Sequence, residues 1–348
     1  MSGTGFIPKK PRMRAFQSQF RQTFRRLPIA DEHLAFPAAF SHAALFHPLG
    51  FPVRVLSNSP AILAAAKQSW SCFGPFFHHE PLEVRIGVKF GAAHKDALPS
   101  EPEFAFKSNF LVSVADSDNF IVSDLKKGRA MGWVTEATAA SPLYLRYHYI
   151  ESAALSLIAS VHAVALHGAC VRVGGSGVLL CGESGAGKTT LSYAGARSGW
   201  TYVSDDASYL PIYREDRLVV GNCHQVRFRP SAAQLFQEVA GRPITPRAAG
   251  KPSIEVRITE WPTIKTATSA EVDHIVFLNR KGGEQRLVPL SAAGVRSRFQ
   301  MDLIPNPATL AAREMALSRL LKATVSVLRY RDLGFAIGRI NQLAERGW

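Results

Sequence analysis

Eight consecutive residues carry the clearest chemical signal in the sequence. Residues 182–189 read Gly-Glu-Ser-Gly-Ala-Gly-Lys-Thr and match the phosphate-loop template GxxxxGK[ST] at every fixed position. In such a loop, successive backbone N–H groups turn toward phosphates, the lysine reaches the β and γ phosphates, and the hydroxyl ligates Mg²⁺. The sequence therefore predicts ATP and Mg²⁺ as cofactors, bound by Gly182, Glu183, Ser184, Gly185, Ala186, Gly187, Lys188, Thr189 and Thr190. ATP is favoured over GTP because no Asn-Lys-x-Asp segment follows.

The elements around this loop are those that its mechanism needs. An apolar run at 178–181 precedes the loop, and residues 188–197 can form a helix that Gly199 ends. Residues 200–206 then read as a strand, next to that of the loop, that ends in Asp205 and Asp206. Adjacent residues on a strand point in opposite directions. We therefore expect one aspartate to accept a proton from an attacking hydroxyl and the other to serve Mg²⁺.

A histidine is expected beside the loop. Residues 169–173 and 177–181 read as a β-hairpin around a three-residue turn at 174–176. In that register His167 lies opposite Glu183, where it could bond a phosphate or steady a carboxylate. A histidine that serves only packing in the core is the competing interpretation.

The remaining chain organises into a tail and two domains. A length of 348 residues, 47% of them hydrophobic and 20% charged, indicates a globular protein with sizeable cores. Residues 36–140 predict a small α+β domain with a β-meander, and residues 141–348 predict an α/β domain. The elements expected are strands at 51–55, 82–90, 110–114, 120–123, 132–134 and 324–329, and helices at 60–69, 142–166, 307–323 and 337–345.

The charge is concentrated in the tail. The chain has 41 Lys plus Arg against 27 Asp plus Glu, and its first thirty residues contain no acid. Within residues 1–35, Phe16, Phe20 and Phe24 recur at helical spacing among arginines. This segment would either pack on its own domain or make weak contact with an anionic membrane or a partner. Nucleic acid is not an expected partner.

Cysteine usage and hydropathy indicate a cytoplasmic protein. The four cysteines form no CxxC pair and no zinc-ligand cluster. No apolar segment follows the basic N-terminus as in a secretory signal. The longest uncharged stretch, 152–171, contains two histidines and a glycine and is better read as a buried helix that runs into a strand than as a membrane span.

Together these features resemble the catalytic domain of HPr kinase/phosphorylase, a P-loop protein-serine kinase related in fold to phosphoenolpyruvate carboxykinase. The resemblance spans about residues 160–280 and rests on His167-Gly168, the strand from Gly177, residues 182–189, Gly199 and Asp205-Asp206. It implies an α/β P-loop kinase domain in which Asp205 is the general base, Asp206 belongs to the metal site, and Lys188 and His167 are catalytic. The segment Ile254-Glu-Val-Arg257 resembles a family segment whose glutamate assists the metal, which implies Glu255 as a further metal residue.

We therefore expect a kinase that transfers the γ-phosphoryl group of ATP to a hydroxyl, most simply serine, of a protein or peptide. The acceptor differs from HPr, because residues 290–310 lack the family's HPr-binding loop. Lys251 and Arg257 are candidates to supply positive charge to the phosphoryl transfer from the following loop. A non-catalytic ATP-binding adaptor, a small-molecule kinase and a homo-oligomer stay open. An ABC-type ATPase is disfavoured because no Leu-Ser-Gly-Gly-Gln segment occurs.

Overall fold

The computed structural model describes residues 40–91, 98–245, 252–281, 283–290, 295, 299 and 306–346, which form a mixed α/β fold with several sheets. The predictions for the tail (1–35), for Lys251 and for most of residues 290–305 lie outside the described residues. Within the described part of the chain, no helix is long and apolar enough to cross a membrane.

The first sheet is built from residues 42–135. Its strands are β1 (His42–Phe46), β2 (Val53–Ser57), β3 (Leu82–Lys89), β4 (Glu103–Lys107), β5 (Phe110–Val114), β6 (Phe120–Asp124) and β7 (Arg129–Thr135). The spatial order is β1-β2-β3-β7-β6-β5-β4. Strands β4 to β7 form the expected antiparallel meander, whereas β2, β3 and β7 run parallel.

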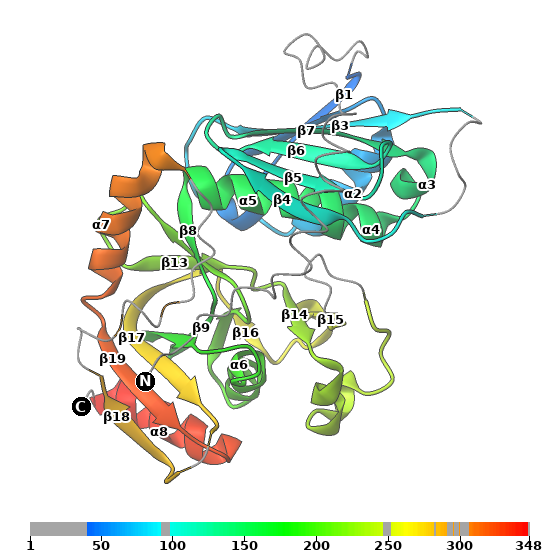
Figure 1. The fold of residues 1–348 in the computed structure, drawn as a ribbon. Coiled ribbons are helices and arrows are strands. Elements are labelled where there is room, and N and C mark those ends of the chain that lie inside the picture. The colour runs from blue at the N-terminus through cyan, green and yellow to red at the C-terminus, as the bar shows by residue number, and fades with distance from the viewer. Residues whose placement is uncertain are drawn as a thin grey trace, which may run out of the picture.

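Helices cover one face of this sheet (Figure 1). They are η2 (Pro48–Gly50), α2 (Pro60–Trp70), α3 (Glu136–Ala139), α4 (Pro142–Leu145), the π-helical turn η3 (Arg146–Ile150) and α5 (Glu151–Val161). Helix α2 begins as predicted, with Pro60 in its first turn and the Ser59 hydroxyl accepting from the N–H of Ala61 at 3.4 Å. The alternating residues of β3 and the apolar face of α5 share one core.

The second sheet contains ten strands in the described part of the chain. They are β8 (Ala163–Leu166), β9 (Gly168–Val173), β10 (Ser176–Cys181), β11 (Thr201–Ser204), β12 (Ser208–Pro211), β13 (Leu218–Gly221), β16 (Lys265–Thr266), β17 (Ser269–Asn279), β18 (Arg286–Pro289) and β19 (Thr324–Arg329). The main path is β16-β11-β9-β10-β17-β13-β12-β8, and β19 pairs with β17 and β18. Strands β14 (Gln225–Phe228) and β15 (Ile254–Arg257) form a separate antiparallel pair.

The helices of this part pack on both faces of the second sheet. They are α6 (Lys188–Arg197), η4 (Pro230–Gln234), η5 (Gln237–Val239), η6 (Ile258–Glu260), η9 (Pro307–Thr309), α7 (Leu310–Leu320) and α8 (Leu333–Arg346). Helices α6 and α8 share a core with β9, β10 and β19, whereas α7 packs against β12, β13 and β17. Figure 1 shows α8 at the opposite end of the molecule from the first sheet.

Three local predictions were wrong by small amounts. The helix expected at 142–166 ends at Val161, and residues 163–166 form β8. The hairpin turn has two residues, because Val173 pairs with Ser176 and Gly174 adopts φ +59°, a conformation that favours glycine at the first turn position. The strand before Asp205 is not the direct neighbour of β10, because β9 lies between β11 and β10.

The division into domains stays a prediction. The predicted boundary at residue 141 assigns α5 to the second domain, yet α5 packs its buried side chains into the core of the first sheet and also contacts β8. Helix α5 therefore lies at the junction of the two sheets.

Candidate functional site

The phosphate loop, residues 182–189, connects β10 to α6 as the sequence predicts. Three of its glycines have a positive φ that favours glycine, +149° at Gly182, +88° at Gly185 and +95° at Gly187. A Cβ on Gly187 would lie 2.3 Å from the Tyr330 hydroxyl, which itself donates to the carbonyl of Ala186 at 2.9 Å. The loop conformation therefore requires glycine at position 187 and is held from outside by Tyr330.

Lys188 is buried inside this loop and contacts His167. Its Nζ donates to the carbonyls of Gly182 at 2.8 Å and Glu183 at 3.3 Å, and lies 2.9 Å from His167 Nε2. An ammonium can only donate, so Nε2 accepts and the proton of the neutral imidazole is on Nδ1. That nitrogen lies 3.5 Å from Asp206 Oδ1. Lys188, His167 and Asp206 thus form a connected row, although the hairpin register places His167 one residue away from its expected position.

The strand predicted at 200–206 ends at Ser204, so Asp205 and Asp206 follow β11, and the two aspartates differ in environment. Asp205 is only 9% exposed, and its Oδ2 accepts from the backbone N–H of Arg227 at 2.8 Å. Its backbone carbonyl accepts from the Thr189 hydroxyl at 3.4 Å. Asp206 has a side chain that is 36% exposed and lines the same cavity as the loop. The residue that faces open space is therefore Asp206 rather than Asp205.

A cavity of about 630 Å³ opens in front of the loop. Its lining on the side of the loop comes from Ser184, Gly185, Gly187, Lys188, Thr189 and Thr190, and His167 and Asp206 also line the cavity. The rest of its lining includes Tyr147 of η3, Tyr209 of β12 and Leu235, which follows η4. Of the other residues predicted to bind nucleotide, Gly182 and Glu183 provide carbonyls to Lys188, and Ala186 packs against the core of α6.

Glu255 does not join Thr189 and Asp206. Its Oε2 accepts from Tyr147 Oη at 2.5 Å and from Arg227 Nε at 2.9 Å, and its Oε1 lies 3.7 Å from Arg146. These contacts engage both carboxylate oxygens in an ion-pair cluster of which Tyr147, Glu151 and Arg227 line the cavity, whereas Glu255 does not. The metal role that the family resemblance implies for Glu255 is not supported by this placement.

Three arginines of the cavity were missed by the sequence reading. Arg227, Arg229 and Arg280 all line it. Arg280 follows β17, which runs parallel to β10, and its guanidinium lies over the Tyr330 ring at 5.8 Å. The parallel pairing of two buried strands is the signal that could have placed Arg280 beside the loop. Arg257, the predicted cation, is instead exposed at the end of β15.

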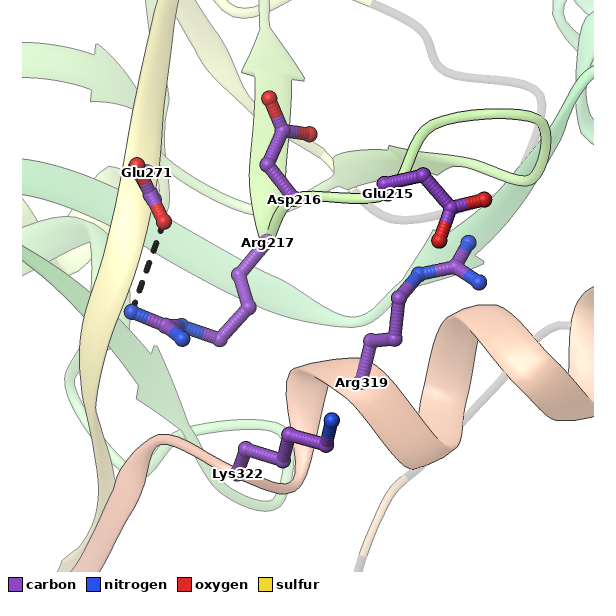
Figure 2. Close-up of a pocket in the computed structure, with 6 residues that line it drawn as sticks. All are labelled: Glu215, Asp216, Arg217, Glu271, Arg319 and Lys322. Carbon is purple, nitrogen blue, oxygen red and sulfur yellow. Dashed lines mark ion pairs between the residues drawn. The ribbon is translucent and has the colours of Figure 1, made fainter.

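A second cavity, of about 390 Å³, lies away from the phosphate loop. Figure 2 shows its six lining residues, Glu215, Asp216, Arg217, Glu271, Arg319 and Lys322, from the region of β13, β17 and α7. Arg217 lies 3.5 Å from Glu271 and 3.3 Å from Asp273, and Asp216 is paired with Arg214. Its lining holds three acidic and three basic side chains, so this cavity offers no excess of positive charge to phosphates.

The oxygen atoms near the loop would suit a magnesium ion that binds together with a nucleotide. Among the described residues, no three His, Cys, Asp or Glu side chains gather as a metal site. Mg²⁺ bound with a triphosphate needs only one or two protein oxygens, since phosphates and waters supply the rest. The Thr189 hydroxyl, with Asp205 and Asp206 at the same end of the sheet, provides such oxygens.

Comparison with known proteins gives a distant structural resemblance only. No protein-family model matches the chain, and no curated protein matches it. Among solved structures, the chain is similar to the Hpr(Ser) kinase/phosphatase from Coxiella burnetii. The match covers 53% of this chain and 93% of that chain, at 16% identity and a TM-score of 0.29. The function of this chain is therefore argued from its own residues.

Proposed function

We propose that the protein is an ATP- and Mg²⁺-dependent phosphotransferase that phosphorylates a hydroxyl group. The observation that supports this most directly is the row of Lys188, His167 and Asp206 at the mouth of a glycine-containing phosphate loop. A phosphate-binding cation, an imidazole and a carboxylate within one cavity are the groups that phosphoryl transfer uses.

The loop side of the cavity binds the nucleotide. Backbone N–H groups of residues 184–190 and the N-terminus of α6 face the phosphates, and Lys188 leaves its carbonyl partners to neutralise the β and γ phosphates. Thr189 and the neighbouring Asp205 serve the magnesium that accompanies ATP. Asp205 suits this position because its backbone carbonyl contacts the Thr189 hydroxyl.

Asp206 accepts the proton of the acceptor hydroxyl. It lines the cavity, whereas the carboxylate of Asp205 is bonded to the backbone of Arg227. As the acceptor oxygen attacks the γ phosphorus, its proton passes to the Asp206 carboxylate and ADP leaves. His167 orients this carboxylate through Nδ1–H. This assignment exchanges the roles that the family resemblance implies for the two aspartates.

The acceptor is a serine hydroxyl of a protein or peptide, or a small molecule that carries a hydroxyl. A small-molecule acceptor is retained because the cavity volume, about 630 Å³, is within the range of small-molecule binding sites. We also propose that the protein acts in the cytoplasm and associates with itself. Its basic tail would make contact with an anionic membrane or a partner.

Transfer of labelled phosphate tests the proposal. The purified protein is incubated with γ-labelled Mg-ATP and either serine-containing peptides or a cell extract separated by mass, and the labelled species are identified. Lys188→Ala should abolish nucleotide binding and transfer, whereas Lys281→Ala should preserve both, because Lys281 forms only an exposed ion pair with Glu183. Binding of ATP without any labelled product would favour an adaptor. Equal activity in the parent and Lys188→Ala would refute the assignment.

A further inference from the structure

A continuous chain of polar contacts links the helical layer of the first sheet to the phosphate loop. The Ser69 hydroxyl of α2 donates to Glu151 Oε1 at 2.8 Å, and Arg227 of β14 donates to Glu151 Oε2 at 2.8 Å. The backbone N–H of Arg227 holds Asp205 Oδ2, and the carbonyl of Asp205 accepts from Thr189. Ser69, Glu151, Arg227, Asp205 and Thr189 thus connect α2 to the first turn of α6.

The centre of this chain is buried and charged. Side chains of Glu151, Glu255, Arg146 and Arg227 are 11%, 12%, 7% and 18% exposed, and the two acids face the two arginines. Burial opposes ionisation of Glu151, but Arg227 and Arg146 outweigh it and hold the pKa of Glu151 below its ordinary value. Removing one member of such a group leaves a buried charge without its partner, which is strongly destabilising. The four side chains are therefore expected to keep one arrangement.

The position of the Arg227 backbone depends on this cluster. Among the described residues, strand β14 pairs only with β15 and belongs to neither large sheet. It is placed by packing of Val226 and Phe228 against α6, by the Tyr202 hydroxyl that donates to the carbonyl of Gln225 at 3.0 Å, and by the side chain of Arg227. Because Asp205 accepts from the backbone N–H of Arg227, a shift of β14 moves the Asp205 carboxylate.

We propose that Glu151 and Arg227 are positioning residues that set the Asp205 carboxylate, and through it the magnesium side of the site, from the helical layer of the first sheet. The proposal rests on the proposed function, since it concerns the same nucleotide site. It gives the first sheet a role: its helix α5 supplies the anchor for the strand that orients Asp205. A displacement of α5 relative to β14 changes the requirement for Mg²⁺ without touching the nucleotide.

The test measures binding of a fluorescent ATP analogue as a function of Mg²⁺ concentration. Glu151→Gln should raise the Mg²⁺ concentration for half-maximal binding by about tenfold, the low end of losses seen when groups behind a metal site are changed. Glu238→Gln is the matched control, because Glu238 also pairs with a tyrosine and an arginine, Tyr193 and Arg197, but lies outside the chain of contacts. It should leave the Mg²⁺ dependence unchanged.

A double-mutant cycle separates positioning from general damage to the fold. In the background of Asp205→Asn, Glu151→Gln should have less than about a twofold further effect, because the residue through which it acts is already changed. Full additivity with Asp205→Asn, or a change in Glu238→Gln as large as in Glu151→Gln, would overturn the proposal. Should Glu151→Gln fail to fold, Arg227→Lys, which keeps the charge but loses the bridge to two carboxylates, serves in the same cycle.

The same experiment distinguishes this inference from the proposed function. Absence of Mg²⁺-dependent binding in the parent, or binding that survives Lys188→Ala, would refute the nucleotide site itself. Normal binding in the parent with an unchanged Mg²⁺ requirement in Glu151→Gln would refute only the positioning role.

Discussion

His162 makes folding stability depend on pH. It follows α5 at the junction of the two sheets, is 7% exposed, and stacks on His79 and Phe51 at ring-centroid distances of 4.4 Å and 5.6 Å. In the described part of the chain, neither ring nitrogen has a hydrogen-bond partner. Burial, with a contribution from His79, lowers the pKa of His162 from 6.5 to about 4.

The lowered pKa of His162 sets the direction and size of the change in the free energy of unfolding with pH. Between about pH 6.5 and pH 4 the unfolded chain binds a proton at His162 that the folded protein does not, so the free energy of unfolding rises with pH over this window. Each pKa unit corresponds to about 1.4 kcal/mol, so the full contribution of neutral His162 to the free energy of unfolding is about 3 kcal/mol. It is present above the unfolded pKa and is lost as the pH falls toward 4.

Urea unfolding of the parent and of His162→Phe at pH 7 and pH 4.5, followed by tryptophan fluorescence, measures this contribution. Phenylalanine keeps the stacked ring and cannot titrate. Between pH 7 and pH 4.5 the free energy of unfolding should therefore fall by about 2 to 3 kcal/mol more in the parent than in the variant. His78→Phe is the control, because His78 is exposed and lies outside the stack. An equal fall in the free energy of unfolding in the parent and in His162→Phe would refute the role of His162 in the pH dependence.

Two further predictions concern the site. Gly187→Ala should weaken Mg-ATP binding by about tenfold or more in calorimetric titration, because a Cβ with φ +95° would collide with Tyr330, whereas Gly175→Ala, which meets no atom within 4 Å, should bind normally. Normal binding by Gly187→Ala would contradict the loop geometry. Asp206→Asn should lower phosphoryl transfer by about 10² or more with little change in ATP affinity, and Asp205→Asn should instead raise the Mg²⁺ requirement. The opposite outcome in the two variants would restore the roles implied by the family resemblance.

Elements with strong local patterns could be predicted from the sequence. Helix α6 and strands β5 and β19 have the bounds expected, because each is fixed by short-range features: a glycine that ends a helix, or an apolar run between turn residues. The one-residue error in the β9–β10 hairpin has a different origin. Gly174 permits a tight two-residue turn, and the flanking residues are compatible with either register.

The buried ion-pair cluster could not be predicted, because its members are far apart in the sequence. Glu151 and Arg227 are separated by 76 residues, and Tyr147 and Glu255 by 108. A signal did exist: Arg146 and Glu151 are the only charged residues of the otherwise apolar segment 142–171. A charge within a buried helix requires a partner, which indicates a long-range contact without naming it.

The two walls of the cavity differ in how they are encoded, and this explains what the sequence reveals about function. Phosphates are bound by backbone N–H groups and one lysine of a single continuous loop, so a local template identifies that wall. The rest of the lining includes Tyr147 of η3, Tyr209 of β12 and Leu235 after η4, and only the fold brings these residues together. Under the proposed function, we expect the residues that select the acceptor to be in this part of the lining. Because η3 continues directly into α5, the same helical segment contributes both Tyr147 and Glu151 to the cavity, and Glu151 also pairs with Arg227.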